Sequence, residues 1–321
     1  MLLALVAFVL WAHPSLVGLP CAALLFIAPG SQDRPGGGGG WSQPIAGMIG
    51  AVSLALLVVS GTSGSRLAAV TSAYIVLATA AFVSFMLLAP RPILQQALRS
   101  IVAAGIATAV LIQVLWAPAP FRFDAWGSLA WEATRLASTT MRMIVEVAPE
   151  AFPVYEPVVR FVSVTWPGML ALQTLAGLAL AWQLYVRLAP PAANAGAAAR
   201  PALARFKDFY MGDAWVWGIV AWLGVLILPV SGALHVAGAN VGLVAATLYV
   251  LRGAAIVATF AEAFGVSAVA LVIVAAAAAA LAVPLLFVLP GLCTLGITDT
   301  WYQYRRRLAA ARGAGPIQPK D

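Results

Sequence analysis

Between Glu262 and Asp299 the chain runs for more than thirty residues without a charged side chain. An α-helix needs only about 20 predominantly apolar residues to cross the hydrocarbon core of a bilayer. Soluble domains carry about 25% charged residues, whereas this chain is 9% charged and 63% hydrophobic. Too little charge is present to cover a water-facing surface, so the sequence predicts a polytopic membrane protein.

Other apolar runs of spanning length recur along the chain, separated by short polar or Pro/Gly-containing segments. They predict an all-α transmembrane helix bundle with about eight spans, or seven or nine if the first or last run is divided differently. The predicted spans are 1–28, 44–60, 67–89, 100–116, 166–188, 214–229, 239–260 and 266–295. Because no internal repeat and no soluble domain are evident, one integral membrane domain is expected over residues 1–321.

The stretch 124–147 differs from these spans. Apolar residues from Leu129 to Val147 recur at steps of three and four, and charged residues from Glu132 to Glu146 follow the same steps on another face. This pattern predicts an amphipathic helix that lies at the membrane interface. Three prolines follow and are expected to end helical continuity, so residues 118–160 are predicted to hold this helix and a connector with Pro149, Pro153 and Pro157.

Three further segments are predicted to connect or end the bundle. Residues 29–43 are a Gly-rich loop, residues 189–212 a Pro/Ala-rich basic linker, and residues 305–321 a basic C-terminal tail. The arginines behind the net charge of +7 are scattered through such segments, which favours anionic lipid headgroups over nucleic acid as the partner. A small excess of positive charge favours cytoplasmic termini in a bacterial inner membrane.

The last span is followed by aromatic and basic residues. Aromatic rings are typical of the headgroup region, where cations bind lipid phosphates. A membrane anchor is therefore predicted from Trp301, Tyr302, Tyr304, Arg305, Arg306 and Arg307.

Polar residues inside apolar runs are the best candidates for function, because an unpaired charge at mid-membrane costs at least about 2.5–3.5 kcal/mol. Arg252 lies about 18 Å of helix beyond Asn240, with Tyr249 three residues earlier on the same face. Arg252, Tyr249 and Asn240 are candidate ligand-binding residues. The alternative is that Arg252 forms a structural ion pair or extends its side chain to the interface.

Asp299 is a candidate for a structural polar contact. Its neighbours one turn on, Tyr302 and Gln303, are not cations, and Arg305 is off its face if the helix continues. Its partner is therefore expected on another segment. By depth, His235 and Asn240 are predicted, while Arg252 is expected to lie too deep.

Catalytic groups are sparse. The two histidines form no HExxH motif, and no P-loop or paired-carboxylate metal site is present, so neither an enzyme activity nor a metal or cofactor is predicted. A remote alternative is an intramembrane serine protease that uses Ser63 of "GTSG" and His235 of "HVAGANVG". These motifs match rhomboid patterns, but their separation of about four spans opposes a dyad.

The C-terminal third contains "FYMGDAWVW", Asn240, "LYVLRGAAIV" and "GITDTWYQYR" in that order. In these motifs residues 160–308 resemble the YybS-like multi-pass membrane proteins, a bacterial family of uncharacterised activity (domain of unknown function family 2232). The resemblance implies a membrane-embedded helical fold. It also makes Asp213, the acid before one helix, a candidate for a structural polar contact.

Two functions remain open at this point. A small-molecule binding or transport subunit without its own ATPase predicts a mid-depth cavity lined by Arg252, Tyr249 and Asn240, and an ATPase or membrane partner protein. A non-transporting scaffold or assembly partner predicts a closed bundle in which Arg252 is held in an ion pair.

Overall fold

The computed structural model describes residues 12–30, 65–88, 92–116, 125–147, 149–188, 205–228, 232–280 and 285–311. Every regular element in these ranges is helical, which confirms the all-α prediction. Where the sequence suggested one domain, the chain divides into two compact units, Met1–Leu203 and Ala204–Asp321. The predicted span 44–60, most of the Gly-rich loop, residues 189–204 of the linker and residues 312–321 of the tail lie outside the described residues.

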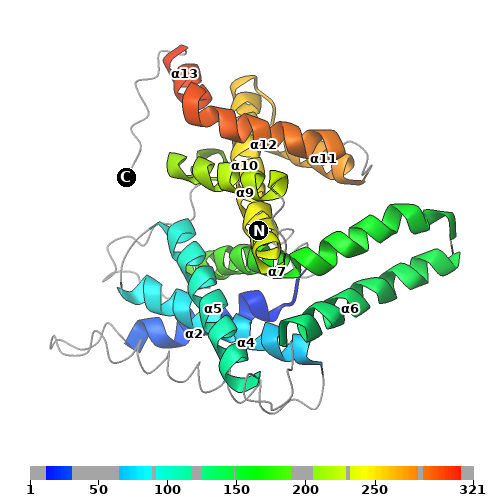
Figure 1. Ribbon diagram of the computed structural model, residues 1–321. Coiled ribbons are helices and arrows are strands. Elements are labelled where there is room, and N and C mark those ends of the chain that lie inside the picture. The colour runs from blue at the N-terminus through cyan, green and yellow to red at the C-terminus, as the bar shows by residue number, and fades with distance from the viewer. Residues whose placement is uncertain are drawn as a thin grey trace. The chain divides into compact units, whose positions relative to one another are not determined.

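In the first unit, α2 (Ser15–Gly30), α4 (Arg66–Leu88), α5 (Ile93–Trp116) and α7 (Phe152–Leu188) pack together (Figure 1). Among the long apolar helices of the described chain, α4 is the most enclosed. Ala73 and Phe82 on α4 are completely buried, and small residues such as alanine let helices approach closely in membranes. Helix α5 turns the stripe from Val102 to Val114 outward, as a lipid-facing helix surface requires.

The helix expected over 124–147 is present as α6 (Ala125–Val147). Leu129 and Ala133 on one face are buried against the bundle, while Trp126 and Trp131 are exposed. Helix α6 and the first part of α7 form an antiparallel hairpin that projects from the other helices of this unit (Figure 1). The amphipathic pattern therefore belongs to a helix that is fastened to the bundle along one side only.

The prediction that the prolines after α6 end helical continuity was wrong beyond Pro149. One short turn, η1 (Pro149–Ala151), follows α6, and α7 then runs unbroken for 37 residues from Phe152. Pro153 lies in the first turn, where no backbone donor is needed. Pro157 removes one hydrogen bond, a loss that membrane helices accommodate.

The polar stretch before the fourth predicted span also proved to be helical, because α5 begins at Ile93 rather than at Ser100. Gln96 is 1% exposed and donates from its side-chain amide to the Phe85 carbonyl on α4 at 3.2 Å. Ser100 donates to the Gln96 carbonyl at 2.6 Å. These polar groups are hydrogen-bonded inside the bundle, so they do not require a water-exposed connector.

The second unit is built on α10 (Ala233–Ala263), which packs against α9 (Val216–Ile227) and α12 (Leu285–Tyr302). Two short turns, η2 (Phe206–Asp208) and η3 (Asp213–Trp215), precede α9. The predicted last span 266–295 is divided between α11 (Ala268–Ala280) and α12. The start of the predicted basic tail forms a further helix, α13 (Tyr304–Ala311).

Within the described residues, four helices are long and apolar enough to cross a membrane. These are Arg66–Met86, Ile93–Val114, Glu156–Leu188 and Leu234–Ala263. Ser15–Leu25 and Val216–Val225 are shorter apolar helices. The predicted total of about eight spans is not confirmed.

Candidate functional site

Helices α10 and α12 cross with their backbones in close contact, at a glycine on each helix. A Cβ atom on Gly253 would lie 2.0 Å from the carbonyl oxygen of Leu292, and a Cβ on Gly296 would lie 2.1 Å from that of Tyr249. Only glycine fits at both positions, as at the small-residue crossings of membrane helices. This crossing brings the middle of the 31-residue α10 to the C-terminal half of the 18-residue α12.

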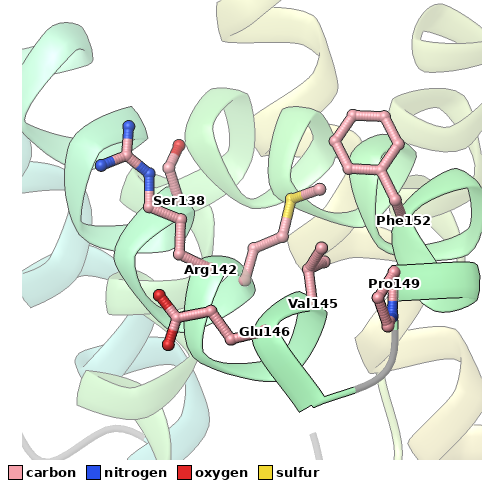
Figure 2. A pocket seen from close by; sticks show the side chains of 7 residues that line it. Ser138, Arg142, Val145, Glu146, Pro149 and Phe152 are labelled. Atoms are coloured by element: carbon pink, nitrogen blue, oxygen red, sulfur yellow. The ribbon is translucent and has the colours of Figure 1, made fainter.

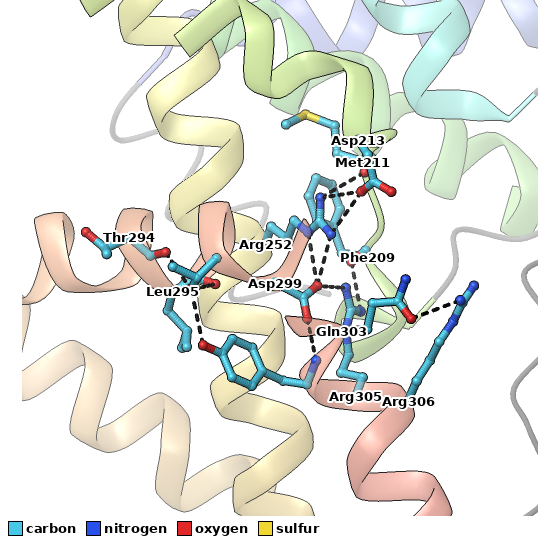
Figure 3. A network of polar contacts seen from close by, with 12 residues as sticks. Phe209, Met211, Asp213, Arg252, Thr294, Leu295, Asp299, Gln303, Arg305 and Arg306 are labelled. Atoms are coloured by element: carbon cyan, nitrogen blue, oxygen red, sulfur yellow. Dashed lines mark hydrogen bonds and ion pairs between the residues drawn. The ribbon is translucent and has the colours of Figure 1, made fainter. Parts of the chain in front are cut away.

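Next to the crossing, Arg252 of α10 meets Asp299 of α12 (Figure 3). The Arg252 side chain is 2% exposed and that of Asp299 is 5% exposed. The Nε atom of Arg252 donates to Oδ2 of Asp299 at 3.1 Å, and Nη2 lies 3.1 Å from the same oxygen. A charge-assisted contact of this kind is about twice as strong as a neutral hydrogen bond.

The segment before α9 completes the surroundings of Arg252. Its Nη1 donates to the Met211 carbonyl at 3.1 Å, and both terminal nitrogens contact Oδ1 of Asp213 at 3.3–3.4 Å. The guanidinium carbon lies 5.1 Å from the centroid of the Tyr210 ring, a cation–π distance. Each of the three guanidinium nitrogens therefore has at least one acceptor of its own chain within reach.

Asp299 has two further partners because the chain turns sharply after α12. Gln303 adopts a left-handed conformation with φ of 48°, a common way to end a helix. The backbone N–H of Tyr304 then donates to Oδ1 of Asp299 at 3.0 Å, which caps α13. Arg305 is directed back towards the cluster, with Nη2 3.6 Å from Oδ2 of Asp299.

Arg305 also connects α13 to the segment before α9. Its Nη1 donates to the carbonyls of Lys207 and Phe209, each at 3.0 Å. The cluster therefore contains the buried Arg252 and Asp299, the largely buried Arg305 and the half-exposed Asp213, and its formal charges cancel. We call these four residues the charge cluster. Paired in this way, they hold α10, α12, α13 and the segment before α9 together.

These contacts correct the predicted partner of Asp299. His235 and Asn240 were expected, but Asp299 pairs with Arg252, which the sequence had placed too deep, and with Arg305, which it had placed on another face. The depth estimate failed because it counted residues from the helix ends. Helix α10 has 31 residues and α12 has 18, so positions at different distances from their helix ends meet at the crossing. The face estimate failed because the left-handed Gln303 interrupts the helical period.

The other candidate residues are separated from the charge cluster or enclosed beside it. Tyr249 is completely buried in the second unit. Asn240 lies twelve residues before Arg252 on α10 and donates to the Val236 carbonyl at 2.7 Å. His235 is exposed in the first turn of α10. The three ligand-binding candidates therefore do not share one open cavity around Arg252.

The anchor residues fall into two groups. Trp301, Tyr302, Arg306 and Arg307 are exposed, as an anchor requires. Arg305 is not, because its side chain is 16% exposed and lies in the charge cluster. Tyr304 is also only half-exposed, and its hydroxyl lies 3.4 Å from that of Thr298. Tyr304 and Arg305 therefore differ from the four exposed residues of the predicted anchor.

The glycines of "HVAGANVG" have a packing role. A Cβ on Gly238 would meet the side chain of Val225, and one on Gly242 would meet that of Trp222. These glycines therefore let α10 pack closely on α9. Ser63, the other half of the remote protease alternative, lies outside the described residues.

The hairpin of the first unit carries a groove that the sequence did not indicate. This groove has a volume of about 550 Å³ and is open to the surface (Figure 2). Apolar side chains of Met141, Val145 and Phe152 share it with Arg142 and Glu146. Its opposite charges and open shape do not select one kind of ligand.

A second contact without a local sequence signal joins α6 to α4. The carboxylate of Glu132 accepts hydrogen bonds from the Ser65 hydroxyl at 2.7 Å, the Leu67 N–H at 2.8 Å and the Arg66 N–H at 3.3 Å. N–H groups at a helix start have no intrahelical acceptor. Burial raises the pKa of Glu132, but these hydrogen bonds and the Arg66 charge outweigh burial, and the net pKa is lowered.

The apolar helices, with a buried ion-pair cluster between α10 and α12, define the chain as a helical membrane protein. Residues 148–300 match the family model described as "Predicted membrane protein (DUF2232)". The match confirms the resemblance inferred from the C-terminal motifs, and it extends from η1 to Thr300 in α12. No curated relative and no solved structure matched the chain.

Proposed function

We propose that the chain is a membrane scaffold or assembly partner that does not itself carry a substrate. The observation that supports this proposal is the enclosure of Arg252. This residue is 1% exposed, and its donors face Asp299, Asp213 and the Met211 carbonyl. An arginine that recognises an anionic substrate keeps donors available for it, whereas these donors already bind groups of the same chain.

The charge balance of the cluster supports the same function. Two arginines and two aspartates sum to zero, so no positive surplus remains to attract an anion. The cluster instead links three helices and the segment before α9, which a rigid assembly platform requires. A fixed cluster of this kind stabilises one arrangement of the helices.

A small-molecule binding or transport subunit remains the second candidate, and one observation favours it. The Asp213 side chain is 49% exposed while its carboxylate contacts Arg252, so a polar path leads from the surface to the guanidinium. In this case a separate polypeptide supplies the ATPase. Under both proposals the chain is not an enzyme and lies in a bacterial cytoplasmic membrane with both termini in the cytoplasm.

Native purification in mild detergent, with identification of bound metabolites and copurifying proteins, tests the two proposals. The comparison uses the wild-type protein and the charge-neutral double variant Arg252→Met/Asp299→Asn. If the chain is a scaffold, the same partner proteins copurify with the folded wild type and with the folded double variant, in the same ratio of partner to chain. A small anionic metabolite that is retained by the wild type and lost from an equally stable double variant would overturn the scaffold proposal.

A further inference from the structure

The C-terminal end of α12 and the start of α13 expose an aromatic and cationic surface on the second unit. We call Trp301, Tyr302, Arg306 and Arg307 the terminal edge. Trp301 is 64% exposed and Tyr302 is 51% exposed. The guanidinium carbon of Arg307 lies 5.7 Å from the centroid of the Tyr302 ring, so the cation and the ring form one surface.

The three consecutive arginines at the start of α13 point in different directions, because an α-helix turns about 100° per residue. Arg305 is directed inward and contacts the Lys207 and Phe209 carbonyls and Asp299. Arg306 and Arg307 on the following positions of α13 are exposed. The chain therefore uses one arginine of the triplet in its core and presents two to its surroundings.

The two outward arginines are not neutralised by acids in the described chain. The only side-chain hydrogen bond that the structure gives Arg306 there is to the neutral Oε1 of Gln303, at 3.1 Å. The carboxylates of the ion pairs between described residues contact Arg160, Lys207, Arg252 and Arg305 instead. The terminal edge therefore has a local positive surplus beside exposed aromatic rings.

We propose that the terminal edge binds the phosphate headgroup of an anionic phospholipid. Guanidinium groups match phosphate oxygens in shape and charge. Tryptophan and tyrosine rings favour the depth of the bilayer at which those phosphates lie. The edge follows directly on α12, which carries no charged side chain before Asp299 and exposes Phe287, Val288 and Leu289, so its cations follow an apolar helix surface. The inference does not depend on whether the chain is a scaffold or a transport subunit.

The test measures lipid binding to the full chain in detergent by native mass spectrometry. Phosphatidylglycerol is the anionic probe and phosphatidylcholine is the zwitterionic comparison. We expect wild-type protein to hold phosphatidylglycerol more tightly. Arg306→Ala/Arg307→Ala should weaken the tightest phosphatidylglycerol site about 30-fold, from roughly 1 kcal/mol for each arginine near an anionic surface. Arg306→Lys/Arg307→Lys retains both charges and should stay within about threefold of wild type.

A matched control removes two exposed arginines of the first unit. Arg160→Ala/Arg187→Ala lowers the net charge by the same two units and should leave the tightest site unchanged. Arg305→Ala should lower the melting temperature instead, without abolishing the preference for phosphatidylglycerol in the folded protein. Wild-type affinity in the Arg306→Ala/Arg307→Ala variant, an equal loss in the control, or no preference over phosphatidylcholine would each overturn the proposal.

Discussion

Replacing Arg252 with methionine and Asp299 with asparagine, singly and together, measures how strongly the charge cluster joins α10 to α12. Arg252→Met removes both contacts at 3.1 Å from Asp299. The carboxylate then keeps Arg305 at 3.6 Å and the Tyr304 N–H at 3.0 Å. Asp299→Asn preserves the oxygen that caps Tyr304 but turns an amide N–H₂ towards the Arg252 guanidinium.

The expected magnitudes follow from these remaining contacts. Removing one member of a buried ion pair costs about 3–5 kcal/mol. Because Asp299 keeps two partners, Arg252→Met should cost about 3 kcal/mol, near the lower limit. Asp299→Asn leaves Arg252 with Asp213 and the Met211 carbonyl, and about 2 kcal/mol is expected. The double variant removes both members of the closest pair, while Arg305 keeps the Lys207 and Phe209 carbonyls. It should cost about 3 kcal/mol in total, which gives a coupling energy of about 2 kcal/mol.

The measurement is the free energy of unfolding in mixed micelles, followed by tryptophan fluorescence. The Lys207–Glu262 pair in the same unit is a matched control, with a separation of 2.7 Å but side chains that are 29% and 61% exposed. Its cycle, Lys207→Met with Glu262→Gln, should give at most about 1 kcal/mol of coupling. If the two cycles give equal coupling, or if the Arg252 and Asp299 variants simply add, the cluster is not the buried linkage described above.

Three further predictions concern other contacts. Gly296→Ala should lower the melting temperature strongly because its methyl group would meet the Tyr249 carbonyl, whereas Gly291→Ala on the same helix meets nothing within 4 Å and should not; equal melting temperatures would exclude the close crossing. Gln303→Gly should stabilise the protein by about 1 kcal/mol by removing left-handed strain, and Gln303→Val should destabilise it; the reverse order in thermal melts would contradict this conformation. Glu132→Gln should cost about 1 kcal/mol of unfolding free energy at neutral pH. Because folding lowers the pKa of Glu132 below its ordinary value of 4.5, the stability of the wild type should fall as the pH drops through the folded pKa and approach that of the variant. A constant difference in stability between the two proteins down to pH 3 would refute the cap.

The helical class and the amphipathic α6 could be predicted because both depend on local periodicity and charge content. Several helix boundaries could not be predicted, since they depend on tertiary hydrogen bonds. Gln96 appeared to mark a connector, but the Phe85 carbonyl satisfies its side chain inside the bundle. Pro157 appeared to end a helix, but one missing hydrogen bond does not outweigh the packing along α7.

The residues of the charge cluster could be selected from the sequence, but their pairing could not. Arg252 and Asp299 were conspicuous as charges in or beside apolar runs. Their contact depends on a crossing that Gly253 and Gly296 permit, and on a left-handed residue that turns Arg305 inward. Neither feature has a period, so the depth estimate misplaced Arg252 and helical-wheel reasoning misplaced Arg305.

The separation of these partners along the chain bears on how the protein is made. Asp213 precedes Arg252 by 39 residues and Asp299 follows it by 47. At about 5–20 residues per second, the ribosome supplies Asp299 roughly two to nine seconds after Arg252. During that interval Asp213 is the only acid of the cluster that has been synthesised. Stable integration of α10 therefore begins with the segment before it and is completed only when α12 arrives, so truncation before α12 leaves a membrane helix with half of its neutralising charge.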